Sequence, residues 1–212
     1  ARTTANHRSE ESLDDALIRQ GVVGAREIDT RALTRHLRDR GAMRMGIFSG
    51  ASADLASDEM LRRVREIPEM LGASLASEVT TQKPYVVGHG RFRVAALDLG
   101  IKRNTPKEFA KFDITTTIYP ADSSIAEIFG DHPDGFFVSN GPGDPATAFH
   151  AIALVQESLR RGIPFFGICF GQQIFARAIG LDTYKLRFGH RGLNQPVQEI
   201  ATGRISITSH NH

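Results

Sequence analysis

The order of apolar and polar positions divides the chain into a helical first part and a later part in which strand and helix patterns alternate. Three early segments carry apolar residues at helical spacing, namely 12–20, 30–40 and 58–66. Ser12 supplies a start signal for the first, and Gly21 and Pro68 supply stop signals for the first and third. The residues from 78 to 90 lack this period and are rich in glycine and proline, which predicts a linker.

Beyond residue 91, short apolar runs alternate with amphipathic stretches of helical period. The runs predict strands at 92–98, 114–119, 136–139 and 164–168. Helices are predicted at 104–111, from Ser123, around 149–159, and from Cys169 to about residue 179. Helical crossovers of this length connect parallel strands. The pattern therefore predicts an α/β fold, in which a parallel sheet flanked by helices is preceded by part of a smaller N-terminal domain.

Two glycine-rich turns directly follow predicted strands, so both are expected at the carboxyl edge of the sheet, where ligands gather. The first, Gly167-Ile168-Cys169-Phe170-Gly171, has the form of a nucleophile elbow, in which larger flanking residues would collide with neighbouring backbone. A helix N-terminus favours thiolate over thiol, and its N–H groups can hold an oxyanion. Most lone cysteines are small buried hydrophobes, so this motif alone leaves both interpretations open.

The second turn reads Ser139-Asn140-Gly141-Pro142-Gly143-Asp144-Pro145. Its two glycines around a proline predict a rigid loop with unobstructed backbone N–H groups, which suits a carboxylate or an oxyanion. The alternative is an ordinary strand-to-helix connection. Because no Gly-Lys-Ser/Thr follows, a phosphate-binding loop of the Walker type is excluded.

Composition narrows the class of protein further. The 212 residues carry a formal net charge of +2, which is too small to indicate nucleic-acid binding. No apolar run approaches the ~18–20 residues of a membrane span. The single cysteine excludes an internal disulfide and suits a reducing compartment. We therefore expect a cytoplasmic protein with neither a nucleic-acid nor a membrane partner.

Taken together, the two turns resemble those of the class I (triad-type) glutamine amidotransferases. A further string, Phe188-Gly189-His190-Arg191-Gly192-Leu193-Asn194-Gln195-Pro196-Val197, is similar to the small subunits of carbamoyl-phosphate synthetases, as are Ile28–Arg38 and Gly41-Ala42-Met43. The resemblance runs from about residue 6 to residue 212. It implies a class I amidotransferase-like α/β fold in two parts: residues 1–88 as the C-terminal part of an N-terminal domain plus linker, and residues 89–212 as a truncated glutamine amidotransferase domain.

The resemblance also implies a function, that of the glutaminase subunit of a glutamine-dependent carbamoyl-phosphate synthetase. Cys169 would be the catalytic nucleophile and would form a thioester with L-glutamine. The residues implied in substrate binding are Gly141, Gly143, Phe170, Gln173 and Asn211, with oxyanion-binding N–H groups on Gly141 and Phe170. Ammonia would pass to a large subunit that makes carbamoyl phosphate for arginine and pyrimidine synthesis. No cofactor or metal is expected in this chain, and ATP and Mg²⁺ are expected on the large subunit.

Some features of the family pattern leave alternatives open. The catalytic base and its orienting acid, a His-Pro-Glu-like motif, are expected beyond residue 212, so the chain is expected to be an internal fragment with little turnover of its own. His190 and His212 are the candidate bases if that assignment fails. Gln172 stands where the family commonly has histidine and is expected to be tolerated. The alternative functions are another class I glutamine amidotransferase and a catalytically idle subunit that only binds a partner.

Overall fold

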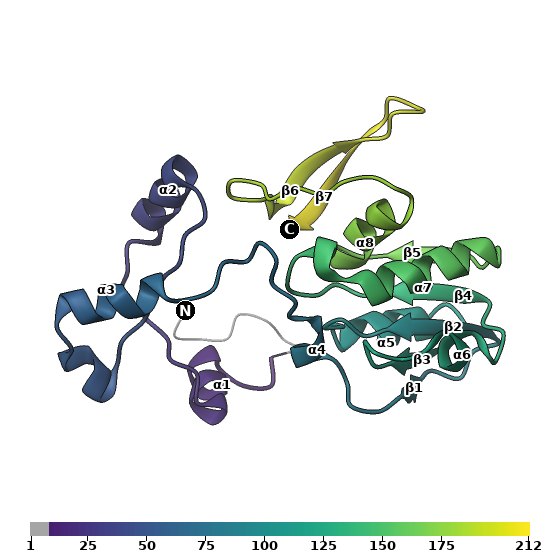
Figure 1. The fold of residues 1–212 in the computed structure, drawn as a ribbon, viewed down its shortest axis with the longest axis horizontal. Coiled ribbons are helices and arrows are strands. Elements are labelled where there is room, and N and C mark those ends of the chain that lie inside the picture. The colour runs from purple at the N-terminus through teal and green to yellow at the C-terminus, as the bar shows by residue number, and fades with distance from the viewer. Residues whose placement is uncertain (1–8) are drawn as a thin grey trace. The chain divides into compact units, whose positions relative to one another are not determined.

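The computed structural model describes residues 9–212, which form two compact units divided between Pro68 and Glu69 (Figure 1). The first unit contains the helices α1 (Leu13–Gln20), α2 (Thr30–Arg40) and α3 (Ser57–Arg65) and the 3₁₀ turn η1 (Gly50–Asp54). The three predicted helices are thereby confirmed. Ser12 caps α1 by accepting a hydrogen bond from the N–H of Asp15, and Gly21 ends it in a left-handed conformation with φ 64°.

The second unit is built on a five-stranded sheet. Its strands are β1 (Tyr85–Val87), β2 (Phe92–Leu97), β3 (Ile114–Tyr119), β4 (Gly135–Val138) and β5 (Phe165–Gly167), in the order β1-β3-β2-β4-β5. In this sheet β2, β3, β4 and β5 run parallel to one another. β1 pairs antiparallel with β3. This parallel-dominant sheet confirms the predicted α/β fold class. The predicted division into residues 1–88 and 89–212 concerns the family's domains and stays a prediction.

The segment expected to be a linker contributes β1 to the sheet, so that expectation was wrong for its second half. Tyr85 pairs with Ile118 at the edge of the sheet. Gly88 and Gly90 do not mark a free connection: a side chain at Gly90 would overlap the backbone of Asp113. Glycine at this position permits two backbone segments to approach closely. Because glycine also marks linkers, the sequence pattern does not distinguish the two roles.

Helices cover both faces of the sheet (Figure 1). They are α5 (Asn104–Ala110), α6 (Ile125–Phe129), α7 (Phe149–Arg160) and α8 (Phe170–Ala178), with a short α4 (Ala76–Val79) and the 3₁₀ turn η2 (Pro145–Thr147). The core cluster on one face joins α6, α7 and α8, and the cluster on the other face packs against Phe109 of α5. Among the described residues, no helix combines the length and the apolar character that a membrane crossing requires.

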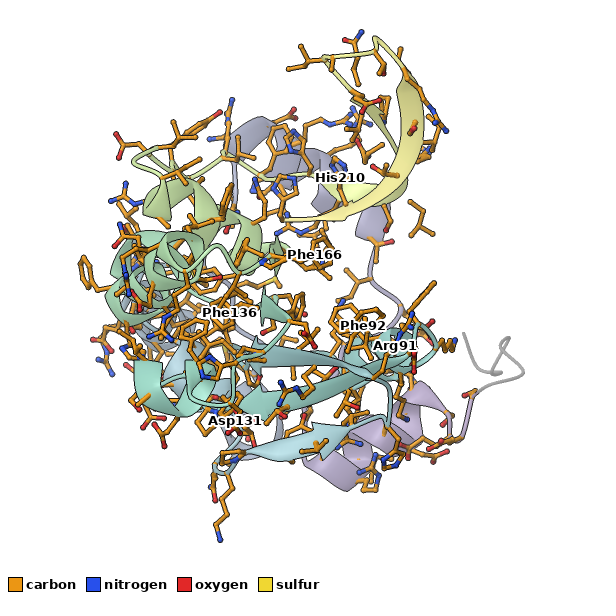
Figure 2. All side chains as sticks on the ribbon, turned by 90° about the vertical axis from the view of Figure 1, so that its right-hand side faces the viewer. Arg91, Phe92, Asp131, Phe136, Phe166 and His210 are labelled. Atoms are coloured by element: carbon orange, nitrogen blue, oxygen red, sulfur yellow. The ribbon has the colours of Figure 1, made fainter. Side chains whose placement is uncertain are left out.

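Alternating side chains on the central strands supply the core. Phe136 points to the face of α7 and α8, where its ring lies 5.1 Å from that of Phe129 and 6.1 Å from that of Phe165. Phe137 points to the opposite face and makes an edge contact with Phe109 at 5.1 Å. Figure 2 shows Phe136 within the layered part of the unit. The described residues with buried apolar side chains all belong to this second unit.

A two-stranded antiparallel ribbon, which the sequence did not predict, follows α8. It consists of β6 (Arg191–Gln198) and β7 (Ile205–Asn211) and forms a sheet of its own. The yellow ribbon in Figure 1 ends beside the C label. Leu193 and Ile207 on this ribbon are largely exposed, so neither strand buries an apolar face in the described part of the chain.

We predict that Phe136→Ala destabilises the protein by about 3–5 kcal/mol, because it removes a buried aromatic ring and leaves a cavity. Phe136 is 1% exposed, whereas Phe149 on α7 is 75% exposed. The matched Phe149→Ala variant should therefore change the free energy of unfolding by less than about 0.5 kcal/mol. Urea unfolding of both variants measures the difference, and equal effects would contradict the assignment of the core.

Candidate active site

Cys169 occupies a strained turn between β5 and α8. It is the N-cap residue of α8 and adopts φ 54° and ψ −104°. A non-glycine residue held at positive φ costs about 1–3 kcal/mol, and such strain is retained where the surrounding structure imposes it, often at functional sites. The half-buried thiol is thus placed at the end of the sheet and at the N-terminus of a helix.

The two glycines that flank this turn are required by close backbone contacts. A Cβ atom on Gly167 would lie 2.6 Å from the carbonyl carbon of Gly171, and one on Gly171 would overlap the carbonyl oxygen of Val138. The N–H of Gly171 also donates a hydrogen bond of 3.1 Å to the carbonyl oxygen of Ser139. The sequence prediction that side chains would collide at both positions is confirmed.

The second glycine-rich loop, residues 139–145, starts at the end of the neighbouring strand β4 and is held against the end of β2. The Ser139 hydroxyl accepts a hydrogen bond of 2.9 Å from the N–H of Leu99. The Asn140 side-chain amide donates a bond of 2.7 Å to the carbonyl oxygen of Gly100. A side chain on Gly141 would overlap the carbonyl oxygen of Leu99. The loop therefore presents its backbone in a fixed position.

A segment remote in sequence packs across the same loop. The Asp144 carboxylate accepts a hydrogen bond of 2.9 Å from the N–H of Gly72. The N–H of Asp144 donates a 2.9 Å bond to the carbonyl oxygen of Ala73. A Cβ on Gly143, which has φ 104°, would lie 2.7 Å from that same oxygen. These contacts bring Met70 and Leu71 to the site, and no local pattern could have marked them because their partners lie about 70 residues away.

A cavity of about 410 Å³ opens between the two loops, the 70–75 segment and the end of the ribbon. All six residues expected to act on or bind a substrate line it: Gly141, Gly143, Cys169, Phe170, Gln173 and Asn211. The structure therefore brings together every residue that the sequence predicted for the site. Their individual roles stay predictions.

The thiol lies beside a carbonyl oxygen and at the start of a helix. Cys169 Sγ lies 3.6 Å from the carbonyl oxygen of Asn211, to which it donates. As the first residue of α8, Phe170 has a backbone N–H without a partner inside the helix. Within residues 9–212, the hydrogen bonds of Cys169 include none to a histidine ring. The arrangement can supply a nucleophile and an oxyanion donor, and the proton acceptor is not among its direct contacts.

Charged groups of both signs line the cavity. Lys185 and Arg191 contribute cations, and Asp144 contributes a carboxylate. A substrate that carries both an ammonium and a carboxylate group, as a free amino acid does, would find an opposite charge for each. Sequence analysis missed Lys185 and Asp144 as lining residues, although both lie inside or beside the motifs that it singled out.

His212 also lines the cavity, at the end of the ribbon. Burial lowers the pKa of His212 from its ordinary value, and electrostatic interaction with His190, His210 and Arg191 lowers it further. The imidazole is therefore neutral to a lower pH than a free histidine. A neutral ring at this position can accept a proton or a hydrogen bond at physiological pH.

Comparison with known proteins places these features in a family. The family model described as Glutamine amidotransferase class-I matches residues 95–212. The model described as Carbamoyl-phosphate synthase small chain, CPSase domain, matches residues 1–47. The first of these matches includes both glycine-rich loops and the whole ribbon.

Three curated relatives are each named carbamoyl phosphate synthase small chain. The identity is 54% over 217 residues for the Streptomyces coelicolor protein, 55% over 212 residues for that of Mycolicibacterium paratuberculosis, and 51% over 211 residues for that of Corynebacterium diphtheriae. These alignments cover 98–100% of this chain but 56% of each relative, so the chain spans about half the length of the relatives it matches. It belongs to the class-I glutamine amidotransferase family and is similar along its length to carbamoyl phosphate synthase small chains.

Proposed function

We propose that the protein is the glutaminase subunit of a glutamine-dependent carbamoyl-phosphate synthetase. The observation that carries this proposal is the placement of Cys169 at a strained elbow that opens into a cavity beside a rigid glycine loop. The names of the relatives and the family matches over both ends of the chain support it. A catalytically idle subunit would have no need to maintain a strained cysteine in a substrate-sized cavity.

The proposed chemistry is nucleophilic acyl transfer. The Cys169 sulfur attacks the side-chain amide carbon of L-glutamine, while the thiol proton passes to a base. The resulting oxyanion accepts hydrogen bonds from the backbone N–H groups of Gly141 and Phe170. Protonation of the amide nitrogen then lets ammonia leave, which produces a glutamyl thioester. Water cleaves the thioester to glutamate and regenerates the thiol.

The remaining lining residues would position the substrate. Gln173, on the first turn of α8, and Asn211, at the end of β7, bring side-chain amides to the cavity. We propose that Lys185 attracts the α-carboxylate of glutamine and that Asp144 faces its α-ammonium group. Gly143 would contribute through its backbone at the cavity wall, because its Cβ position faces the Ala73 carbonyl oxygen.

The proposal extends to the partner and the pathway. Relatives named as small chains imply a large chain, to which ammonia would pass and which would use ATP and Mg²⁺. Carbamoyl phosphate made in this way would serve arginine and pyrimidine synthesis in the cytoplasm. Because the chain spans about half of its relatives, the experiments below use the full-length protein with its large subunit.

We predict that Cys169→Ser abolishes glutamine-dependent carbamoyl phosphate synthesis, because a serine hydroxyl is not ionised by the same surroundings and is a much weaker nucleophile. Ammonia-dependent synthesis by the same complex should continue at the wild-type rate. Measuring both activities on one preparation provides an internal control for folding and assembly. Glutamate release by the variant at the wild-type rate would disprove the role of Cys169.

We predict that Gly141→Ala lowers kcat for glutamine hydrolysis by roughly 100- to 1000-fold, the usual cost of losing one oxyanion donor. The added methyl group would overlap the Leu99 carbonyl oxygen and push the backbone N–H out of position. Gly162→Ala is the control, because Gly162 lies outside the lining of this cavity and nothing lies within 4 Å of its added Cβ, so any loss there reflects only the backbone strain of its φ of 68°. A normal kcat in properly folded Gly141→Ala would show that the loop is only structural.

We predict that Lys185→Met lowers kcat/KM for glutamine by about 10- to 100-fold, which corresponds to the loss of one hydrogen bond to a charged group. The effect should fall mainly on KM, since the α-carboxylate keeps its charge throughout the reaction. Lys83→Met, which alters an exposed lysine outside the cavity lining, should leave the kinetics unchanged. Steady-state glutamate release measures both variants, and equal kinetics would exclude Lys185 from substrate binding.

A further inference from the structure

Three histidines gather where the ribbon begins and ends. The backbone N–H of His190 donates a hydrogen bond of 2.8 Å to the carbonyl oxygen of His212, and the N–H of His212 returns one of 3.0 Å to His190. These two bonds continue the pairing of β6 with β7 and hold the two residues opposite each other. His210 lies two positions before His212, and residues at this spacing share one face of a strand. Figure 2 shows His210 on the yellow ribbon.

The ring nitrogens of these residues converge. One potential ligand atom from each of the three rings lies within 4.8 Å of the other two. His190 Nδ1 and His212 Nε2 are 3.3 Å apart. Two nitrogen ligands of a tetrahedral zinc ion, each at about 2.0–2.1 Å from the metal, are themselves separated by about 3.3 Å. The nitrogen atoms of His190 and His212 are therefore already at the spacing that such an ion requires.

We propose that His190, His210 and His212 form a binding site for a divalent transition-metal ion of the zinc class. Imidazole is the preferred nitrogen ligand of these ions, and three histidines leave a fourth position for water or for a group in the adjoining cavity. This site goes beyond the proposed glutaminase function, which makes no use of it.

Two neighbouring groups define the surroundings of the site. Arg191 adds a nearby positive charge that weakens binding of a cation, but its Nη1 atom is engaged by the carbonyl oxygen of Phe188 at 2.6 Å. Cys169 does not belong to the histidine group, since its thiol bonds to the Asn211 carbonyl instead. His212 lines the cavity, so an ion held by the three rings would stand at the cavity rim.

The test is metal titration of the full-length protein after treatment with a chelator. Isothermal titration with Zn²⁺ should give one ion per chain, and Co²⁺ should produce the visible absorption of a tetrahedral site. His210→Gln and His190→Gln should each lower the Zn²⁺ affinity by at least about tenfold and abolish the Co²⁺ band, because losing even a group that only hydrogen-bonds to a metal ligand typically costs about 10- to 100-fold in affinity. The control His36→Gln, which alters an exposed histidine on α2 in the first unit, should bind like the wild type.

Two further measurements keep the result unambiguous. Thermal unfolding of the metal-free variants verifies that each is folded before titration. Because thiolates also bind zinc, the titration is repeated with Cys169→Ser, which should retain the site. Wild-type affinity in both folded histidine variants, or loss of the site in Cys169→Ser alone, would overturn the proposal. Neither readout depends on glutamine hydrolysis, so failure of the metal site and failure of the glutaminase proposal are distinguishable.

Discussion

The close approach of α8 to the end of β4 is the constraint on which the site depends. Gly171 packs directly against the carbonyl oxygen of Val138 and donates a hydrogen bond to that of Ser139. The helix can come this near only without a side chain at that position. The chain must therefore turn sharply between β5 and α8, and the turn forces Cys169 into its strained conformation.

Packing of the following helix offsets this strain. Phe170 and Ile174 on α8 are almost completely buried in the core cluster beside Phe136 and Val138. Burial of each such side chain contributes about 1.5–3 kcal/mol, so the two together exceed the roughly 1–3 kcal/mol cost of one residue at positive φ. The hydrophobic core thus holds the cysteine in place, and the reactive geometry follows from the stability of the sheet and helices.

Some walls of the cavity come from turns that local sequence signals mark, and others come from contacts between residues distant in sequence. The Cys169 turn and the 139–145 loop leave adjacent parallel strands, and hydrogen bonds to Leu99 and Gly100 fix the second of them. The segment at 70–75 and the end of the ribbon complete the walls through contacts such as Gly72 to Asp144 and Cys169 to Asn211. The histidine cluster arises in the same way, because strand pairing places residue 190 opposite residue 212.

The sequence by itself determined the elements whose signals are local. Helical period and caps predicted α1 to α3, apolar runs predicted the four parallel strands, and glycine placement predicted the elbow at Cys169. The family resemblance of the two glycine-rich turns implied the six site residues that line the cavity. Only the tertiary structure decided that Tyr85–Val87 joins the sheet, that Met70 and Leu71 reach the cavity, and that three histidines meet. Each of these depends on a contact between residues distant in sequence. Neither periodicity nor composition predicts which distant segments will be in contact.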